Sequence, residues 1–268
     1  ERDLELEKLL LERFNLSSAR VARVKSNRNS LDAVGKVTAQ YLSDNLSRTK
    51  TIGLSWGKTL QHIVSNMPKI RLMTKPIVFP LVGGLSMMDA VDSGDSLVQL
   101  FSEKIGAVSK HLYAPALVGS EQSYQVLMKE PSIISTLNQA GKVDVGIVGI
   151  GAYGIHSSSR LVSEMQLTEN EYQELVQQKP VGDLCGRFYD AQGKALGNPS
   201  ASRVISVNFD RLAEIPVLIG AASGLEKARG VLGALRSGVL NVLAVDSILA
   251  REVLKLADQD AGLRSSHA

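Results

Sequence analysis

The sequence lacks most features that mark secreted, metal-binding or membrane proteins. Its single cysteine, Cys185, cannot form an internal disulfide, and its few histidines are too scattered to match metal-ligand spacing, so we predict no structural metal. No apolar run reaches the roughly 18 residues that a membrane helix needs, and no secretory leader is recognisable. These absences predict a soluble, cytoplasmic protein that does not associate with membranes.

An excess of charge of one sign is missing as well. The chain has 30 lysines and arginines against 27 aspartates and glutamates, and the two kinds are interleaved along its length. The resulting net charge of +3 is too weak to indicate a nucleic-acid-binding surface. With 268 residues, 44% of them hydrophobic, the chain has enough material for one large α/β domain or two small ones and should bury a substantial core.

The first residues are typical of a connecting segment. Leucines between Leu4 and Phe14 fit one side of a helix loosely, and Ala19 to Val24 alternates as a short strand does. We interpret residues 1–28 as a linker helix and a short strand that follow a missing upstream segment. Residues 29–268 form the main predicted domain, beginning with a helix that Ser30 can cap.

Short apolar runs rich in β-branched residues recur from residue 51 onward. The predicted strands are Thr51 to Leu54, Ile77 to Val82, Asp144 to Val148, Val204 to Val207, Val217 to Ile219 and Val242 to Val245. Because most are nearly all apolar and helical stretches lie between several of them, they fit strands buried on both faces. The fold class is therefore α/β, a doubly wound, mostly parallel sheet whose ligands bind outside the carboxyl ends of the strands.

The segment GLSWGKT, Gly53 to Thr59, runs from a predicted strand into a helix. It ends like a nucleotide-binding P-loop but has three residues instead of four between its glycines, which argues against an ATPase or GTPase. Ser55 and Gly57 are small enough to let backbone N–H groups approach an anion, and Lys58 and Thr59 add a charge and a hydroxyl. The alternative is a tight turn with a solvated Lys58.

A second glycine-rich segment, Gly149 to Gly154, has the spacing of a dinucleotide fingerprint. A true fingerprint opens a helix and is followed by an acidic residue at the end of a second strand, whereas here the next residues are polar and loop-like. We therefore predict no nicotinamide or flavin cofactor, and no other cofactor. Gly149 and Gly151 are interpreted as a loop that passes close under a ligand, or as a tight turn without one.

Two further segments carry candidate polar ligands, one in a predicted hairpin and one after a predicted strand. Asp183 lies in a predicted hairpin with its turn at Asp190 to Gly193, where it could hold sugar hydroxyls, cap the hairpin or pair with Arg187. The loop Gly220 to Gly224 leads to Lys227 near the start of a helix. A cation there opposes the helix dipole unless an anion arrives, which makes Lys227 a candidate phosphate ligand.

Together these segments resemble the effector-binding domain of the SorC family of sugar-responsive bacterial transcription regulators. The matching motifs are SWGKT (Ser55 to Thr59), LVGGLS (Leu81 to Ser86), DVGIVGIGA (Asp144 to Ala152), VGDLCGRFYDAQG (Val181 to Gly193), the Gly220 to Lys227 loop and NVLAVDSILA (Asn241 to Ala250). They cover nearly the whole chain. The resemblance implies a fold like that of ribose-phosphate isomerases and glucosamine-phosphate deaminases, with catalysis replaced by reversible sensing of a phosphorylated sugar.

The resemblance also implies a set of effector-binding residues: Ser55, Gly57, Lys58, Thr59, Gly83, Gly84, Leu85, Gly149, Gly151, Asp183, Gly220 and Lys227. In this set the two lysines and Thr59 would hold the phosphate, and Asp183 would contact the sugar. Val82, before the glycine pair, has no amine, so a covalent imine at that position is excluded. Relatives of this kind form homodimers or homotetramers and, as repressors, bind operator DNA through an N-terminal helix-turn-helix, which would precede residue 1.

Two other functions stay open at this point. An isomerase or deaminase of the same fold would need a positioned base, for which Asp89, Asp183 and Asp246 are candidates, although none lies in a recognisable catalytic pattern. An assembly module whose glycine-rich loops are only turns is the other alternative. Turnover of a sugar phosphate would favour the enzyme, and failure to bind any sugar phosphate would favour the assembly module.

Overall fold

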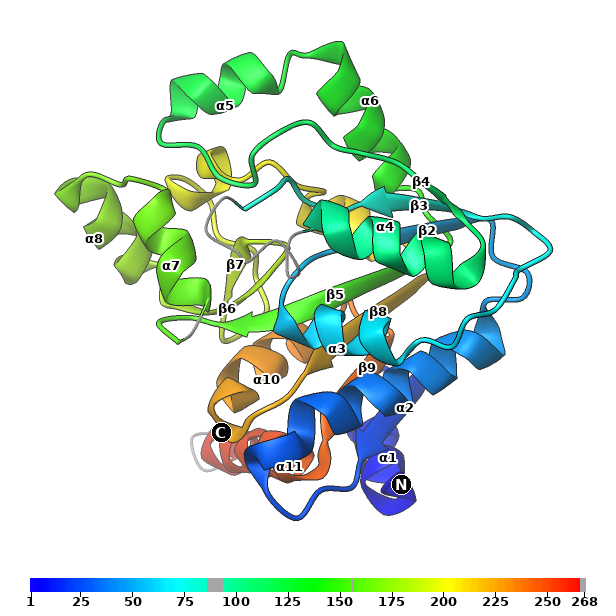
Figure 1. The fold of residues 1–268 in the computed structure, drawn as a ribbon. Helices are drawn as coiled ribbons and strands as arrows, with labels where there is room; N and C mark the ends of the chain where they lie inside the picture. Colours follow the sequence, from blue (N-terminus) through cyan, green and yellow to red (C-terminus); the bar gives the residue numbers. More distant parts are fainter. Residues whose placement is uncertain (86–93, 156, 266–268) are drawn as a thin grey trace.

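The computed structural model describes residues 1–85, 94–155 and 157–265, and a nine-stranded sheet forms the centre of this part of the chain (Figure 1). The strands are β1 (Ser18–Ala22), β2 (Thr51–Leu54), β3 (Ile77–Pro80), β4 (Val108–Ser109), β5 (Val145–Ala152), β6 (Pro180–Leu184), β7 (Arg187–Asp190), β8 (Val217–Ala222) and β9 (Val242–Asp246).

Seven of these strands follow the order β1-β9-β8-β5-β2-β3-β4, and every neighbouring pair in that order is parallel. The far half of β5 also pairs with β6 in the antiparallel sense, and β6 pairs with β7. A mostly parallel sheet with a small hairpin excursion is the predicted fold class, which is therefore confirmed.

Helices cover both faces of the sheet, and others lie beyond one of its ends (Figure 1). They are α1 (Leu4–Arg13), α2 (Ser30–Asn45), α3 (Lys58–Asn66), α4 (Gly94–Ile105), α5 (Glu121–Leu127), α6 (Pro131–Ala140), α7 (Ser157–Glu164), α8 (Glu169–Gln177), α9 (Phe209–Ala213), α10 (Ala228–Arg236) and α11 (Ser247–Ser265). Short 3₁₀ turns occur at η1 (Asn27–Asn29), η2 (Ser200–Arg203) and η3 (Leu225–Lys227).

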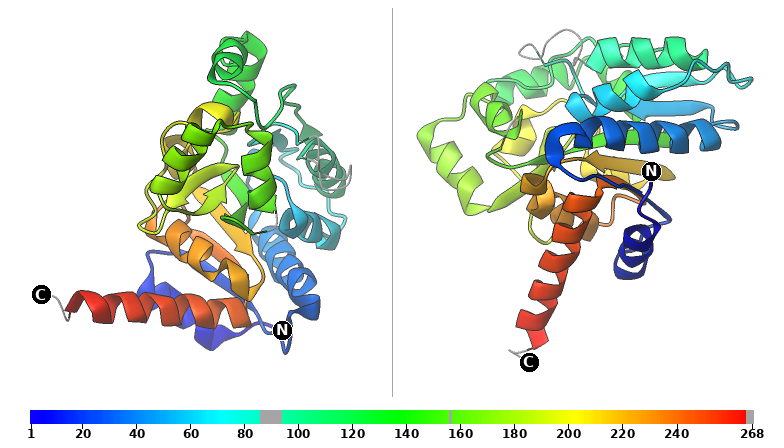
Figure 2. Two further views of the ribbon diagram at one scale, coloured as in Figure 1. Left: turned by 90° about the vertical axis from the view of Figure 1, so that its left-hand side faces the viewer. Right: turned by 60° about the horizontal axis from the view of Figure 1, so that its bottom comes forward.

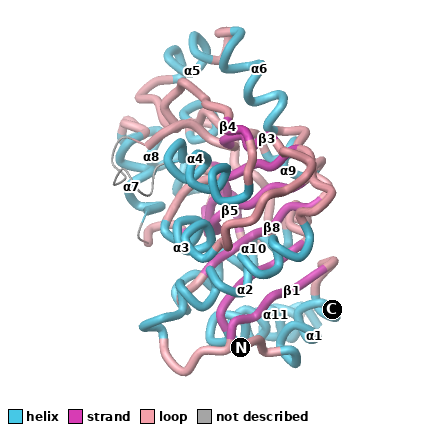
Figure 3. Tube along the Cα trace, turned by 45° about the vertical axis from the view of Figure 1, so that its right-hand side comes forward, coloured by secondary structure: helices cyan, strands magenta, loops and turns pink. Residues whose placement is uncertain are grey.

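Figure 2 shows α2, α3 and α4 on one face of the sheet and α1, α10 and α11 on the other. The chain adds β3 and β4 on one side of β2 and adds β5, β8 and β9 on the other side. Because parallel crossovers are right-handed, connections that advance in opposite directions place their helices on opposite faces. At one end of the molecule α1 lies beside α11, while α5 and α6 lie at the opposite end (Figure 3).

Burial on both faces explains why the central strands are apolar. All five residues of β9 are buried, as are the last five of β8 and the first four of β5. β-branched and small side chains suit such strands because they pack closely between two layers of helices. The strand ends are thereby held rigidly, which positions the loops that follow them.

Several sequence-based predictions of strands need correction, two of them in the middle of the chain and near residue 205. Residues Val204 to Val207 are not a strand, because they make only isolated bridges, from Val204 to Leu117 and from Ser206 to Val82. Their apolar character reflects burial in an irregular segment. The strand predicted to end at Val148 instead continues to Ala152, since its last residues find a new antiparallel partner in β6. Gly149 and Gly151 therefore lie in a strand and not in a loop.

The predicted hairpin turn was also placed wrongly. The chain reverses between β6 and β7 at Cys185 and Gly186, whose φ angles of +53° and +76° are those of a two-residue primed turn. The predicted turn, Asp190 to Gly193, follows β7, where the Asp190 carboxylate accepts hydrogen bonds from the amides of Gln192 and Lys194. Cysteine is uncommon in such turns, whereas aspartate and glycine are typical turn residues. The turn was therefore predicted at Asp190 to Gly193 and not at Cys185.

Candidate functional site

Four neighbouring parallel strands, β8, β5, β2 and β3, end at one edge of the sheet. The segments that follow them at this edge are 55–58 after β2, 81–85 after β3 and 223–227 after β8, together with the far half of β5. The chain reverses its direction of strand addition between β2 and β5, and such switch points are where α/β sheets bind ligands. The predicted glycine-rich segments thus lie on one side of the molecule.

Side chains from the segment after β2 tie three of these segments together. The amide of Ser55 donates to the Ile147 carbonyl at 3.0 Å, and the Ser55 hydroxyl accepts from the amide of Gly149 at 3.2 Å. The indole N–H of Trp56 donates to the carbonyl of Gly83 at 3.0 Å. Both side chains are almost fully buried, so they set the shape of the edge.

The first turn of α3 offers an anion-binding geometry at this edge. Gly57 is its N-cap with φ of +114° and makes no side-chain capping bond, so the amides of the first helical turn are not capped by a side chain. A Cβ added at Gly57 would meet no atom within 4 Å, so glycine is required by the backbone conformation and not by crowding. Lys58 is exposed, whereas Thr59 is buried at the same terminus.

The glycine pair after β3 lies at the edge, but its amides are already occupied. Gly83 donates to the carbonyl of Ile205 and Gly84 to that of Ala114, both at 3.0 Å. A Cβ at Gly83 would come within 2.5 Å of the Pro115 backbone. Close packing therefore accounts for Gly83, and the pair contributes shape to the site rather than hydrogen-bond donors.

Asp183 lies in β6, opposite Gly151 of β5, and only 4% of its surface is exposed. One carboxylate oxygen accepts from the Ser158 hydroxyl at 2.5 Å and the other accepts from the amide of Gly186 at 3.3 Å. Burial raises the pKa of the Asp183 carboxyl, against the opposing effects of these two donors and of the Lys227 charge. Asp183 is thus a buried acceptor whose two oxygens each accept one hydrogen bond and keep lone pairs to spare.

The alternative partner considered for Asp183, Arg187, makes other contacts. Its guanidinium donates to the carbonyls of Val204 and Ser206, each at 3.1 Å. Those bonds fix the irregular segment 204–206 against the hairpin. Asp183 therefore interacts with Ser158, with the amide of Gly186 in the hairpin turn and with the charge of Lys227.

Lys227 approaches the same cluster from the loop after β8. It is the last residue of η3 and the N-cap of α10, and its ammonium donates to the carbonyl of Ile150 at 3.1 Å. Burial lowers the pKa of Lys227, while the charges of Asp183 and Glu226 raise it. An ammonium has three N–H donors, so this bond leaves capacity for an incoming anion.

Gly220 was predicted in the loop but lies within β8, where it is buried. A Cβ there would come within 2.5 Å of the Leu240 side chain, so this glycine serves packing between β8 and the segment before β9. The strand runs three residues further than predicted, to Ala222, and the loop begins at Ser223.

Asp246, a candidate catalytic base, has a structural environment. It is fully buried, and one oxygen accepts from the amides of Ile248 and Leu249 at the start of α11. The other oxygen accepts from the hydroxyl of Ser223 at 2.9 Å and the amide of Gly224 at 3.0 Å. Four donors occupy both oxygens, which leaves none poised to take a proton from a substrate. Asp89 lies outside the described residues.

Within the described ranges, no group of three or more histidine, cysteine, aspartate or glutamate side chains is placed to hold a metal ion. Among the same residues, the helices are all too short or too polar to cross a bilayer. The polar groups gathered at the sheet edge are instead those suited to an anionic, hydroxyl-bearing organic molecule: backbone amides, an ammonium and a buried carboxylate.

The chain was compared with models of known protein families, and one of them matches. A model described as "Putative sugar-binding domain" matches residues 1–255. The chain belongs to this sugar-binding domain family. Its relatives include the sorbitol operon regulator of Klebsiella pneumoniae, which is 27% identical over 256 residues, 94% of this chain and 81% of that protein. The transcriptional regulator LsrR of Klebsiella pneumoniae subsp. pneumoniae is 28% identical over 262 residues, 95% of this chain and 76% of that protein.

Solved structures agree with the family assignment. The crystal structure of the full-length sorbitol operon regulator SorC from Klebsiella pneumoniae superposes with a TM-score of 0.85 at 27% identity, covering 94% of this chain and 80% of that one. The resemblance to the SorC family is therefore confirmed, and the chain is a sugar-binding domain of the kind found in transcriptional regulators. Because the relatives are named as regulators, the enzyme alternative finds no support in them.

Sequence reasoning missed several residues that shape the edge of this sugar-binding domain. Trp56, Ser158 and Ser223 contact partners that lie 27, 25 and 23 positions away, respectively. Only Trp56 carried a detectable signal, since it is the single tryptophan of the chain and stands inside a predicted glycine-rich loop. Ser158 comes from α7, a helix in a stretch that had been interpreted as polar loop.

Proposed function

We propose that this sugar-binding domain reversibly binds a phosphorylated sugar at the sheet edge and thereby controls operator binding by a cytoplasmic repressor, as part of a homo-oligomer and without turnover or a cofactor. The observation that supports this most directly is the grouping of Asp183, Lys227 and the first turn of α3 around neighbouring strands. The helix terminus and the ammonium suit a phosphate, and the carboxylate suits hydroxyl groups.

The desolvation of the two charged groups also favours a ligand of mixed character. Burial raises the pKa of Asp183 and lowers that of Lys227, so each group is less stable in its charged form than it would be in water. A phosphate beside Lys227 and hydroxyls beside Asp183 would replace the lost hydration. A ligand with only one of these features would leave one group uncompensated, which supports a phosphorylated sugar over a free sugar.

A thermal-shift panel tests this function. Ribose 5-phosphate, fructose 6-phosphate, glucose 6-phosphate and sorbitol 6-phosphate are each compared with the unphosphorylated compound and with inorganic phosphate. A ligand at 100 times its Kd adds about 2.7 kcal/mol, or roughly 5–10 °C in Tm for a domain of this size. We expect at least one phosphorylated compound to reach this shift and to be recovered unchanged. Recovery of a converted product would indicate an enzyme, and the lack of any shift would indicate an assembly module.

The pH dependence of binding follows from the pKa of Lys227. Below about pH 6 a phosphate monoester takes up its second proton and loses charge. Because burial lowers the pKa of Lys227, the ammonium loses its proton at a less alkaline pH than an exposed lysine does. Affinity should therefore be greatest between the phosphate pKa and the lowered pKa of Lys227, and it should fall as pH rises through the latter. In that alkaline range, binding should be accompanied by the uptake of a proton by Lys227. Titration calorimetry across pH measures this, and an alkaline limb unchanged in Lys227→Met would contradict it.

A further inference from the structure

A chain of polar contacts begins in the buried loop that carries Lys227 and leads away from the site. Asp246 holds this loop through Ser223 and Gly224, on a single carboxylate oxygen. Its other oxygen caps α11 through the amides of Ile248 and Leu249. A displacement of the loop therefore acts directly on the residue that fixes the start of α11.

The contacts continue from α11 to the first strand. The Ser247 hydroxyl accepts from the amide of Val24 at 3.1 Å, just after β1 ends, and Ala22 of β1 pairs with Asp246 of β9. One turn further along α11, the Arg251 guanidinium donates to the carbonyl of Ser247 at 3.3 Å. The start of α11 is thus joined both to β1 and to the side chain of Arg251.

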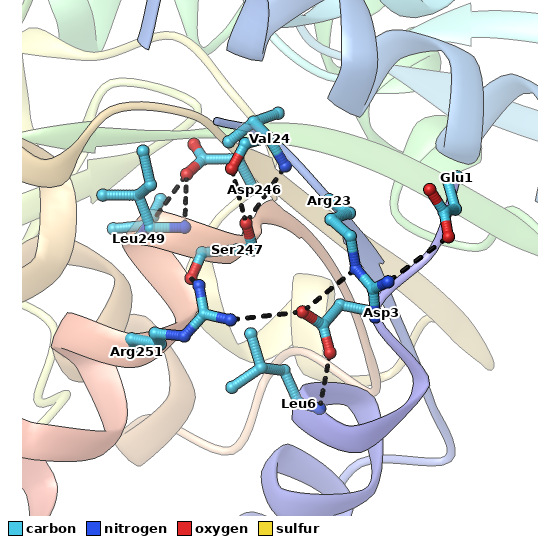
Figure 4. A network of polar contacts seen from close by, with 10 residues as sticks. Glu1, Asp3, Leu6, Arg23, Val24, Asp246, Ser247, Leu249 and Arg251 are labelled. Carbon is cyan, nitrogen blue, oxygen red and sulfur yellow. Dashed lines mark hydrogen bonds and ion pairs between the residues drawn. The ribbon is translucent and has the colours of Figure 1, made fainter. Parts of the chain in front are cut away.

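Arg251 carries the connection to α1, as Figure 4 shows. Its other terminal nitrogen donates to an Asp3 oxygen at 3.3 Å, and Arg23 lies 3.6 Å from the same oxygen. The second Asp3 oxygen accepts from the amide of Leu6 and so caps α1. Asp3 is 4% exposed, whereas the Arg251 side chain is 61% exposed, so Arg251 is the member of the chain most able to change partner.

We propose that Asp246, Ser247, Arg251 and Asp3 form a relay, through which an anion bound at residues 223–227 changes how firmly α1 is held against the sheet. The inference rests on the proposed function, because it describes what ligand binding at that site does to the rest of the domain. These four are positioning residues and do not contact the ligand. Coupling between two sites requires one element that both can bias. Here that element is the start of α11, which is bonded to the loop on one side and to α1 on the other.

A second anchor of α1 provides the matched control. At the other end of α1, Arg13 donates to the Ala257 carbonyl at 3.0 Å and lies 3.5 Å from the carboxylate of Asp258, both on α11. This anchor also joins α1 to α11 but does not pass through residues 246–251. Arg251→Met and Arg13→Met each remove one guanidinium link to α1, and only the first interrupts the relay.

Hydrogen–deuterium exchange with inorganic phosphate as the probe tests the relay without knowledge of the sugar. In the unmodified chain, phosphate is expected to slow exchange in residues 223–227 and to change exchange in residues 4–13 by about fivefold or more, the lower end of typical allosteric couplings. In Arg251→Met the effect at 223–227 should remain and the effect at 4–13 should vanish. In Arg13→Met both effects should persist. Asp3→Asn, which keeps the capping oxygen, serves as a second interruption of the relay.

The possible failures are distinct. If phosphate protects residues 223–227 but leaves residues 4–13 unchanged in the unmodified chain, or if the effect at 4–13 survives in both Arg251→Met and Asp3→Asn, the relay is wrong and the binding site stands. If the effect vanishes equally in Arg13→Met, general packing between α1 and α11 carries it and the relay is again wrong. If phosphate protects neither region, no anion is held at residues 223–227 and the relay is wrong, whereas the proposed function is decided by the thermal-shift panel of phosphorylated sugars.

Discussion

Replacing Lys227 by methionine is expected to weaken binding of a phosphorylated sugar roughly 10- to 150-fold, the range that corresponds to a hydrogen bond to a charged group. The ammonium of Lys227 is half-buried and held at the Ile150 carbonyl, so a phosphate that reaches it loses little to competition from water. Methionine keeps the length of the aliphatic stem and removes the ammonium, with its charge and its N–H donors. Titration calorimetry with the sugar phosphate that gives the largest thermal shift measures the loss.

Two further variants separate the phosphate effect from general damage. Lys58 is exposed at the start of α3, so Lys58→Met should cost no more than about fivefold, as for a solvent-screened ion pair. Asp183→Asn should weaken the phosphorylated and the unphosphorylated sugar by similar factors, because the role proposed for Asp183 is to hold the sugar hydroxyls and not the phosphate. A Lys227→Met variant that loses both forms of the sugar equally would remove Lys227 from the phosphate site.

The architecture was predictable because double-sided burial leaves a clear trace in the sequence. Runs such as Thr51 to Leu54 and Val242 to Val245 are almost entirely apolar, and they match β2 and β9 closely. The same reasoning fails for Val204 to Val207, because a buried irregular segment is as apolar as a strand. An apolar run in the sequence indicates that a segment is buried. Whether that segment is a strand depends on whether another segment pairs with its backbone along its whole length.

The candidate site was predictable only at residues whose side-chain charge is unusual for their position in the predicted fold. Asp183 stood out as a carboxylate in a predicted hairpin and Lys227 as a cation after a predicted strand, and the two side chains lie close enough to interact electrostatically. Their neighbour Ser158 did not stand out, because a serine in a polar stretch has no distinctive pattern. Contacts between segments 25 or more residues apart arise from the tertiary fold, and a single sequence does not encode them in local spacing.

Glycine was the least informative signal, because one residue type serves several physical needs. Gly57 adopts a positive φ, whereas Gly83 and Gly220 make room for Pro115 and Leu240. All three had been grouped as lining a ligand site. Only the structure distinguishes a glycine that is needed for its positive φ from one that is needed because a neighbouring group leaves no space for a Cβ.

Gly151→Ala is expected to damage the site and the fold together. A Cβ at Gly151 would lie 1.8 Å from an Asp183 oxygen and 2.6 Å from the Ser158 hydroxyl, so the carboxylate must move and its hydrogen bond to Ser158 must break. Overpacking of this kind costs about 1–3 kcal/mol, or roughly 2–12 °C in Tm for a domain of this size. Denaturant unfolding measures the stability, and calorimetry measures the accompanying loss of sugar binding.

The control for this substitution is Gly84→Ala. A Cβ at Gly84 would meet no atom within 4 Å, so its stability should stay within about 0.5 kcal/mol of that of the unmodified chain. Equal stability in the two variants, together with unchanged sugar affinity in Gly151→Ala, would mean that Asp183 can leave its place beside Gly151 without consequence and has no part in holding the sugar. We expect a loss of stability in Gly151→Ala alone. Partial recovery in the double variant with Ser158→Ala, whose smaller side chain gives the displaced carboxylate room, would assign the loss to crowding around Asp183.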